Sequence, residues 1–293
     1  MIDRLCIIGV GLIGGSLARA AKRAGICREV VGAGRNEAQL RKAVELGVID
    51  RYSTRIAEAV AGADMVVLAV PLGAMESALR QMAAHLRPDA VVTDVGSAKG
   101  SVVAAVRAVF GAVPGNFVPG HPIAGTEKSG VEASFAELFE DRLVILTPLP
   151  QSSSDALARV RGLWEATGAE VVEMDVEHHD EVLAATSHLP HLLAFTLVDT
   201  LARMDESEEI FRYSAGGFRD FTRIASSDPV MWRDICLANR EAILHVLQRF
   251  VNELGGLTDA MRAGDAEHVL ALFARAKAAR DRYVNNSNGK RSS

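Results

Sequence analysis

The spacing of three glycines near the start of the chain constrains the fold more than any other feature. Residues 5–9 form a short apolar run, residues 12–24 have a helical pattern, and the turn that joins them reads GVGLIG. In such a turn the first glycine permits a tight bend, the second lets the backbone approach a diphosphate, and the third lets the helix pack on the strand. The unpaired amides at the start of the helix would face the diphosphate. The pattern therefore predicts a dinucleotide-binding βαβ unit.

Apolar strands alternate with helical segments over the first 174 residues. This alternation is typical of parallel βαβ units, and strands that are apolar throughout indicate a sheet covered on both faces. We therefore expect an α/β fold with an N-terminal Rossmann-like doubly wound sheet. The expected strands after the first are residues 29–33, 65–70, 90–94, 117–118, 143–147 and 170–174, and the expected helices are 36–46, 75–86, 101–110 and 154–167.

The pattern changes near Asp175, after which no strand is expected. We predict a dinucleotide-binding domain at 1–174, an all-helical C-terminal domain for substrate binding and dimerisation at 175–284, and a disordered tail at 285–293. The expected long helices cover residues 178–204, 207–213, 229–254 and 257–283. Apolar stripes on these helices indicate either core packing or the face of a homodimer. They consist of Leu189, Leu192, Leu193, Phe195 and Leu197, and of Ile243, Leu244, Leu247 and Phe250.

Composition limits the partners and the compartment. The formal net charge of −5 argues against nucleic acid as a partner, so an anionic substrate would need a local basic pocket. The three cysteines are scattered and form no CxxC pair, which favours a reducing compartment. The first residues lack the apolar core of a signal peptide, and no apolar run approaches the ~20 residues that span a bilayer. We therefore expect a soluble cytoplasmic protein that does not bind membranes.

The end of the second expected strand carries the residues that distinguish NAD from NADP. NAD enzymes usually place an acid there, against the ribose 2′-hydroxyl, but this chain has Gly34 and Arg35. An arginine suits a 2′-phosphate, which favours NADP or the use of both cofactors. Alternatively, Arg35 is a solvated loop cation, and Glu37 binds the ribose if the strand extends further. The expected cofactor-binding residues are Gly9, Gly11, Leu12, Ile13, Gly14, Gly34, Arg35, Val70, Pro71 and Ser97.

Two side chains with chemistry of their own follow later strands. Ser97 lies after the fourth expected strand, near the sheet edge where open α/β sheets bind ligands, and Asp94 is placed to fix its loop. His121 lies between glycines after a short strand, and a neutral imidazole there would accept a proton from a substrate hydroxyl as hydride leaves. Taken alone, Ser97 reads as a turn residue and His121 as a loop histidine bonded to backbone.

Five motifs together resemble the prephenate/arogenate (cyclohexadienyl) dehydrogenase family of tyrosine biosynthesis, a branch of aromatic amino acid biosynthesis. They occur in the family's order over nearly the whole chain and read GVGLIGGS, DVGSAKG, GHPIAGTEKSG, SHLPH and GGFRDFTRIA. The resemblance implies an oxidoreductase that passes a hydride from prephenate to NAD(P)+ and releases carbon dioxide, giving 4-hydroxyphenylpyruvate. Arogenate, the amino analogue, would give tyrosine. No metal is implied.

The resemblance also implies roles for individual residues. His121 would take the proton of the ring hydroxyl, and Ser97 would bond and orient that hydroxyl. Arg223 would bind a substrate carboxylate, and His191 would bond the substrate, which favours prephenate or dual use. The other residues implied at the substrate site are Ser187, which is one helical turn before His191, Glu127 as a gate, Asp220 beside Arg223, and Trp232 as a wall.

Three alternatives compete with this interpretation. The spacing of His188 and His191, with His178, His179 and Asp180 nearby, also suits a metal pair, but a third and fourth ligand at a defined spacing are missing. A β-hydroxyacid dehydrogenase shares the two-domain plan but uses a lysine on the first long helix of its second domain. This chain has no lysine between Lys128 and Lys277. A dinucleotide-sensing module without turnover would not need Ser97, His121, His191 and Arg223 together.

Overall fold

A computed structural model describes residues 1–289, and its internal contacts form two compact units, Met1–Ile243 and the chain from Leu244 on. The first unit extends well beyond the predicted boundary near Asp175. The reason is that helix α7 (Val176–Leu183) packs on α5 (Lys99–Phe110), and α11 (Pro229–Ala238) packs on a short 3-10 turn, η1 (Leu72–Ala74). The helices up to Ile243 therefore belong to the same compact unit as the sheets.

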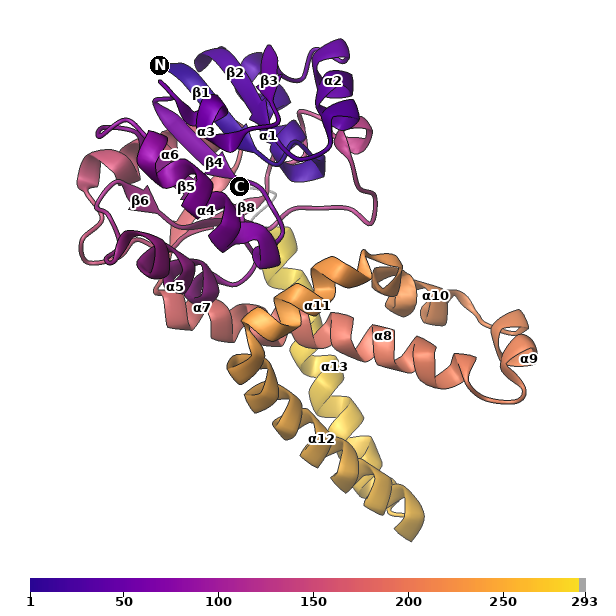
Figure 1. Ribbon diagram of the computed structural model, residues 1–293. Helices are drawn as coiled ribbons and strands as arrows, with labels where there is room; N and C mark the ends of the chain where they lie inside the picture. Colours follow the sequence, from indigo (N-terminus) through magenta and orange to yellow (C-terminus); the bar gives the residue numbers. More distant parts are fainter. Residues whose placement is uncertain (290–293) are drawn as a thin grey trace. The chain divides into compact units, whose positions relative to one another are not determined.

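A six-stranded parallel sheet forms the centre of the first unit, with strand order β3-β2-β1-β4-β5-β6 (Figure 1). This order reverses direction next to β1, as in doubly wound folds that bind dinucleotides. The predicted Rossmann-like α/β fold is confirmed. The strands are β1 (Ile2–Ile8), β2 (Cys27–Ala33), β3 (Arg51–Ser53), β4 (Met65–Leu68), β5 (Val91–Asp94) and β6 (Phe117–Val118).

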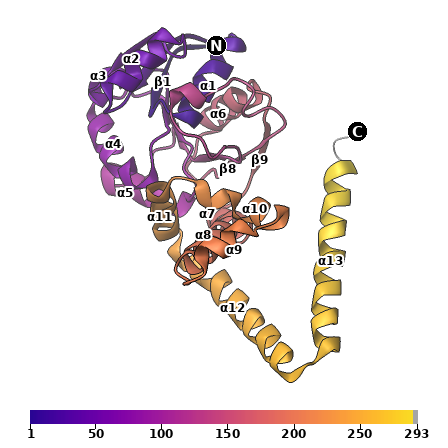
Figure 2. The same cartoon turned by 90° about the vertical axis from the view of Figure 1, so that its right-hand side faces the viewer.

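Both faces of this sheet are covered because successive side chains of a strand point to opposite sides. In β1, Leu5 and Ile7 join one core, whereas Cys6 and Ile8 join the other. Helices α3, α4 and α5 pack on the second core, and α1 and α6 lie across the sheet from them (Figure 2). Helix α2 contributes Leu40 and Ala43 to the first core. The bounds are α1 (Leu12–Arg23), α2 (Glu37–Glu45), α3 (Ile56–Val60), α4 (Met75–Met82) and α6 (Ser154–Glu165), with 3-10 turns η2 (Ala83–His85) and η3 (Val131–Ala133).

The last three strands form a second sheet instead of extending the first, which corrects the expectation of one doubly wound sheet. Strand β7 (Gly120–Pro122) pairs antiparallel with β8 (Leu143–Leu146), and β8 pairs parallel with β9 (Glu170–Glu173). Pro119 separates β6 from β7, and a proline has no amide with which to continue a ladder. The chain therefore leaves the first sheet after two residues of β6, and β7 begins a new one.

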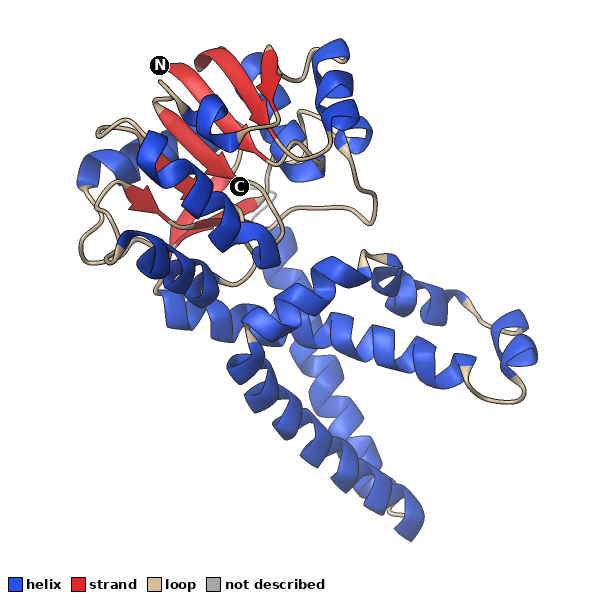
Figure 3. Ribbon diagram, in the orientation of Figure 1, coloured by secondary structure: helices blue, strands red, loops and turns tan. Residues whose placement is uncertain are grey.

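After β9 the described chain contains helices and no further strand (Figure 3). The single helix predicted for residues 178–204 is divided, because a π-helical turn, η4 (Ala184–His188), separates α7 from α8 (Leu189–Ala202). Pro190 explains this turn, since its ring and missing amide disrupt the regular hydrogen bonds of the preceding helical turn. The next elements are α9 (Ser207–Arg212), α10 (Gly216–Thr222) and a 3-10 turn, η5 (Arg223–Ser226). Helix α10 was not predicted, and it contacts α8.

The two longest helices end at different residues from those predicted. Helix α12 (Arg240–Ala263) runs through Gly255 and Gly256, where a break was expected, and ends before Gly264, whose φ of 66° suits a helix terminus. Glycine lowers helix stability without forbidding the conformation. Helix α13 (Ala266–Gly289) includes residues 285–289 of the predicted disordered tail. The remainder of that tail lies outside the described residues.

The helical run Val176–Ala202 is, by length and composition, apolar enough to cross a membrane. This corrects the expectation that no apolar run approaches such a length. A helix from the core of a soluble protein passes the same test. Here the run carries His188 and His191, whose side chains contact other elements of the first unit.

Candidate active site

The residues predicted to bind a dinucleotide follow strands that end side by side. The amide of Gly9 donates to the carbonyl of Ala33 at 2.8 Å, and the amide of Ala69 donates to Ile8 at 2.7 Å. The amide of Val95 donates to Leu68 at 3.1 Å. The carboxyl ends of β1, β2, β4 and β5 therefore meet at one edge of the sheet, where open α/β sheets bind ligands.

The glycine turn has the shape that a diphosphate requires. A Cβ at Gly9, where φ is 100°, would lie 2.3 Å from the carbonyl oxygen of Ala69, and one at Gly14 would lie 2.1 Å from that of Gly9. A Cβ at Gly11 would meet nothing within 4 Å. Helix α1 starts at this point without a side-chain cap and without an acid in its first turn. Its free amides and the open space at Gly11 fit the diphosphate of a dinucleotide.

The segment after β2 presents one cation and no free acid. Strand β2 ends at Ala33, as predicted, and the side chain of Asn36 caps α2 by accepting from the amide of Gln39. Glu37 lies in the first turn of α2, where it accepts from the hydroxyl of Tyr52 at 3.1 Å and pairs with Arg41 at 3.4 Å. Arg35 is exposed and has no ion pair within residues 1–289. The strand is thus too short for the alternative that Glu37 binds the ribose.

A buried ion pair joins the loop after β5 to strand β7. The carboxylate of Asp94 accepts from the amide of Gly96 at 2.7 Å and from that of Gly120 at 3.2 Å. The fully buried Lys99 ammonium donates to Asp94 and, at 2.7 Å, to the carbonyl of Gly120. Burial lowers the pKa of Lys99, and the charge of Asp94 opposes this shift. The pair fixes the loop of Ser97 relative to the strand of His121.

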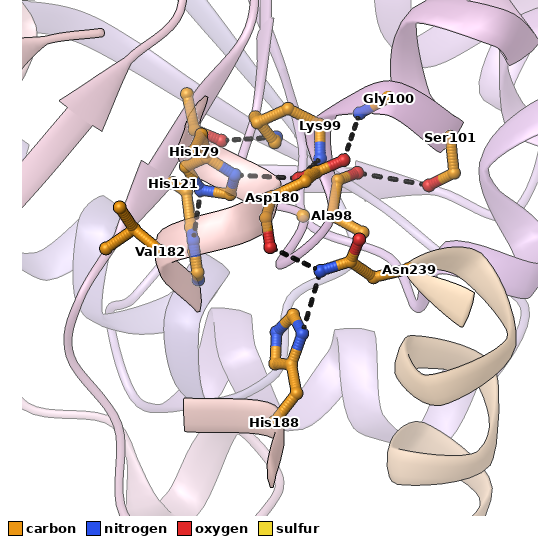
Figure 4. Close-up of polar contacts among 12 residues, drawn as sticks. Ala98, Lys99, Gly100, Ser101, His121, His179, Asp180, Val182, His188 and Asn239 are labelled. Carbon is orange, nitrogen blue, oxygen red and sulfur yellow. Dashed lines mark hydrogen bonds and ion pairs between the residues drawn. The ribbon is translucent and has the colours of Figure 1, made fainter. Parts of the chain in front are cut away.

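Ser97 and His121 differ in their hydrogen bonds. The Ser97 hydroxyl is half-buried and makes no hydrogen bond to any described residue. His121 is buried, and its Nδ1 lies 2.9 Å from Nε2 of His179 on α7 (Figure 4). Burial holds the pKa of His121 well below 6.5, and the charges of His179 and Lys99 act in the same direction. His121 is therefore neutral at neutral pH, as a general base must be.

His179 and Asp180 are part of this site, although the sequence suggested them only as members of a metal cluster. His179 is fully buried, and its Nδ1 lies 2.8 Å from Oδ1 of Asp180. The Asp180 carboxylate also accepts from the amides of Lys99 at 2.8 Å and Gly100 at 2.9 Å, at the start of α5. Within the described residues, no group of three or more His, Cys, Asp or Glu is arranged to hold a metal.

Three aromatic rings from the helical segment contact one another, with Trp232 between the two histidines. His191 lies against Trp232, with ring centroids 3.6 Å apart and planes inclined by 19°, and His188 meets the same indole edge-on. His191 Nδ1 donates to the backbone carbonyl of Ser187 at 2.9 Å, so Ser187 supports His191 through its main chain. The buried atoms Trp232 Nε1 and His188 Nε2 have no hydrogen-bond partner among the described residues. The backbone of Ser97 interacts with His188 and raises its pKa, in opposition to burial.

His188 is held by a residue that the sequence did not suggest. Its Nδ1 lies 3.1 Å from Nδ2 of Asn239, which also donates to the carbonyl of Asp180 at 2.8 Å. Burial lowers the pKa of His188 to about 4. Asn239 therefore joins η4 to α7, and it lies at the point where α11 ends.

Arg223 has an acidic neighbour other than the one predicted. Its guanidinium lies 3.6 Å from the carboxylate of Glu127, and both side chains are largely exposed. Burial lowers the pKa of His191, and the hydrogen bond to Ser187 opposes this shift. The positive charge of Arg223 lowers the pKa further, so Arg223 lies near His191. Asp220 is exposed and has no ion pair within the described part of the chain. The structure thus brings Arg223 to Glu127 and His191, and it leaves Asp220 in solvent.

Comparisons with known proteins cover almost the whole chain. The models for the nucleotide-binding domain and the dimerization domain of prephenate dehydrogenase match residues 17–173 and 175–275. A cyclohexadienyl dehydrogenase of Zymomonas mobilis is 41% identical over 285 residues, or 96% of each chain. A prephenate dehydrogenase of Bacillus subtilis is 38% identical over 96% of this chain and 76% of its own. The crystal structure of prephenate dehydrogenase from Aquifex aeolicus with hydroxyphenyl propionate and NAD+ has a TM-score of 0.89 and 39% identity, and covers 96% of this chain and 98% of that one.

Proposed function

This chain belongs to the prephenate dehydrogenase family, and we propose that it converts prephenate to 4-hydroxyphenylpyruvate by oxidative decarboxylation with hydride transfer to a nicotinamide dinucleotide. The observation that carries the proposal is the combination of a buried, neutral His121 and, on the neighbouring loop, a Ser97 hydroxyl that has no partner in the described chain. Ser97 follows β5, whose carboxyl end lies beside that of β4, and His121 lies in β7, which the buried Lys99 joins to the Ser97 loop. A base and a hydroxyl at this edge suit the oxidation of an alcohol.

The chemistry needs a base, an orienting group and a hydride acceptor. A bound oxidised nicotinamide supplies the hydride acceptor. As the carbinol carbon of the substrate loses its hydride, the hydroxyl on that carbon becomes acidic, and His121 accepts its proton at Nε2, since Nδ1 is engaged by His179. Ser97 bonds the same hydroxyl and orients it. The bond to the departing carboxylate then breaks, its electron pair enters the ring, the oxygen regains a proton from His121, and aromatisation drives the step.

The substrate side of the site comes from the helical segment. We assign the binding of a substrate carboxylate to Arg223, whose guanidinium offers two parallel donors. His191 presents Nε2, because its Nδ1 bonds Ser187, and Trp232 supports the imidazole by stacking. Glu127 competes with the substrate for Arg223, so it acts as a gate.

The family membership supports a nicotinamide dinucleotide, and we propose that this chain prefers NADP or accepts both forms. Arg35 follows β2 directly after Gly34, where it meets no carboxylate among residues 1–289, and Glu37 is engaged by Tyr52 and Arg41. A 2′-phosphate would therefore find a free cation there and no free acid.

Replacing Arg35 tests this cofactor proposal. Arg35→Ala should raise the Michaelis constant for NADP about 10- to 150-fold, since a hydrogen bond to a charged group contributes about 1.5–3 kcal/mol, and leave that for NAD nearly unchanged. Steady-state kinetics with each cofactor gives both constants. Equal changes for NAD and NADP would contradict the assignment of Arg35 to the 2′-phosphate.

Domain roles and assembly follow from the same family. We place the functional boundary at residues 174–175, next to the end of β9, with nucleotide binding at 1–174 and substrate binding and dimerisation at 175–284. The chain forms a homodimer through the second part. Exposed apolar side chains such as Leu244, Val251 and Leu254 fit this role. The three free cysteines fit a reducing compartment, so we place the enzyme in the cytoplasm.

A direct assay tests the reaction. The protein is mixed with prephenate or arogenate and with NAD+ or NADP+, and reduced nicotinamide is followed by absorbance while the aromatic product is identified. We expect reduction with prephenate and formation of 4-hydroxyphenylpyruvate. No reduction in any of the four combinations would contradict an enzyme and favour a dinucleotide-binding module. Activity with a simple β-hydroxy acid would favour the related dehydrogenase class.

A further inference from the structure

Three polar side chains form a continuous chain of hydrogen bonds that ends at His121 (Figure 4). His121 Nδ1 lies 2.9 Å from His179 Nε2, and His179 Nδ1 lies 2.8 Å from Asp180 Oδ1. The imidazoles meet edge to face, with centroids 5.1 Å apart and planes inclined by 63°. This edge-on arrangement lets a ring nitrogen of each histidine lie in line with one of the other.

We propose that His179 and Asp180 are positioning residues for His121, because they hold the His121 proton on Nδ1 and leave Nε2 free to accept the proton of the substrate. The proposal rests on the proposed function for the identity of that substrate. The distribution of protons along the chain follows from the residues alone.

Asp180 determines the direction of every hydrogen bond in the chain. Its carboxylate also accepts from the backbone amides of Lys99 and Gly100, which can only donate. Burial alone would raise the pKa of Asp180, but the bonds from His179 and from these two amides outweigh burial and lower it. Asp180 is therefore an acceptor at neutral pH, and His179 must present a proton on Nδ1.

Because His179 is neutral, the direction of its hydrogen bond to Asp180 also fixes the direction of its hydrogen bond to His121. A neutral imidazole has one protonated and one unprotonated nitrogen. Since the His179 proton is on Nδ1, its Nε2 is an acceptor, and His121 must donate from Nδ1. The unprotonated nitrogen of His121 is then Nε2. Burial lowers the pKa of His179, the bond to Asp180 opposes this shift, and the charge of Lys99 adds to it.

The surroundings leave His179 as the only described group that bonds His121 Nδ1. Lys99 on α5 acts on His121 through its charge, but its ammonium is bonded to Asp94 and to the Gly120 carbonyl. His188 on η4 is bonded to Asn239. Without His179, a free imidazole would favour the tautomer with its proton on Nε2, which cannot serve as the base. The same hydrogen-bonding principle orients histidines in other catalytic sites.

The proton position can be measured without turnover. Nitrogen-15 NMR of the free protein, labelled at histidine, reports which ring nitrogen of each imidazole carries a proton. The His121 signals are assigned by their loss in His121→Asn. We expect a protonated Nδ1 and an unprotonated Nε2. A wild-type His121 with its proton on Nε2 would overturn the proposal whatever the variants do.

Two substitutions at position 179 separate hydrogen bonding from packing. His179→Leu keeps a side chain of similar size but removes the acceptor, so the His121 proton should move to Nε2 and kcat should fall about 100-fold, as on loss of a general base. His179→Gln restores an acceptor oxygen near the position of Nε2. It should return the proton to Nδ1 and recover much of kcat, although it removes the imidazole that bonds Asp180. Michaelis constants should change little in either variant.

The control is His178→Leu, a change at the exposed neighbour of His179, which should alter neither the spectrum nor kcat. A folded His179→Leu protein with wild-type kcat and an unchanged His121 spectrum would refute the proposal. If His179→Leu does not fold, a folded His179→Gln protein with the His121 proton on Nε2 would do the same. If the wild type does not turn over prephenate, the spectra still decide the positioning, so the two failures are distinguishable.

Discussion

In the proposed mechanism, individual side chains divide the reaction between two groups of residues. Ser97 follows β5 of the first sheet and His121 lies in β7 of the second, whereas Arg223, His191 and Trp232 come from the helical segment. The first pair would act on the hydroxyl that is oxidised, and the second group on the remainder of the substrate. This division predicts different kinetic effects for the two groups.

Replacing the base should affect turnover. His121→Asn removes the proton acceptor but retains a polar group near His179, so kcat should fall about 100-fold or more while the fold is kept. Steady-state kinetics with prephenate measures the loss, and circular dichroism checks the fold. Full turnover in this variant would remove His121 from the chemistry.

Replacing the carboxylate ligand should affect binding instead. Arg223→Ala removes an interaction that exists before the transition state, so the Michaelis constant for prephenate should rise about 10-fold or more with a smaller change in kcat. Arg223→Lys should recover only part of this loss, because an ammonium cannot form the paired bonds of a guanidinium. A fall in kcat with an unchanged Michaelis constant would argue against the assignment.

At the level of helices and strands, local patterns predicted most elements, and packing decided where they join or break. The strand ending at Ala33 and the helix capped by Asn36 agree with their local signals. Short elements such as β3 and α3 were missed because three to five residues carry too little periodicity. The helix predicted for 229–254 breaks at Asn239, whose side chain instead bonds Asp180 and His188.

The turn between β1 and α1 allows a matched pair of substitutions. Gly14→Ala would place its Cβ 2.1 Å from the Gly9 carbonyl oxygen, so it should destabilise the protein by about 1–3 kcal/mol, as overpacking does. At Gly11 the new Cβ would meet nothing within 4 Å, so Gly11→Ala should change stability by less than about 1 kcal/mol but weaken dinucleotide binding.

Denaturant unfolding and calorimetric titration with NADP and NAD measure the two effects. Unchanged affinity for both cofactors in a folded Gly11→Ala protein would place the diphosphate elsewhere.

Taken together, the buried histidines make stability depend on pH. The pKa values of His121, His179 and His188 are lowered in the folded state, that of His188 to about 4, whereas an unfolded histidine titrates near 6.5. Between these values the unfolded chain binds more protons, so the free energy of unfolding rises with pH. This stability is fully present above pH about 6.5 and is lost as the pH falls toward about 4.

Denaturant unfolding between pH 4.5 and 7 tests this dependence. One pKa unit corresponds to about 1.4 kcal/mol, so His188 alone contributes on the order of 3 kcal/mol. His188→Gln should therefore reduce the dependence on pH relative to the wild type. If the free energy of unfolding changed equally with pH in the two proteins, His188 would not be buried in its neutral form.

Signals contained in short stretches of sequence were enough to predict the Rossmann-like sheet, the dinucleotide turn and the helical second half, and they nominated the residues of the candidate site. These signals are local, because glycine spacing, strand alternation and helical periodicity reflect steric and hydrophobic constraints on neighbouring residues. The motifs that contain Ser97 and His121 are also local signals, since each lies within a few consecutive residues.

Contacts between distant segments could not be predicted in this way. The separate second sheet, the buried pair of Lys99 with Asp94, and the chain from Asp180 to His121 exist only after packing. His121 and His179 are 58 residues apart, and neither has a local pattern that names the other. Their protonation depends on burial and on hydrogen-bond partners that only the folded chain brings together, so the sequence could nominate His121 as a base but could not name the residues that support it.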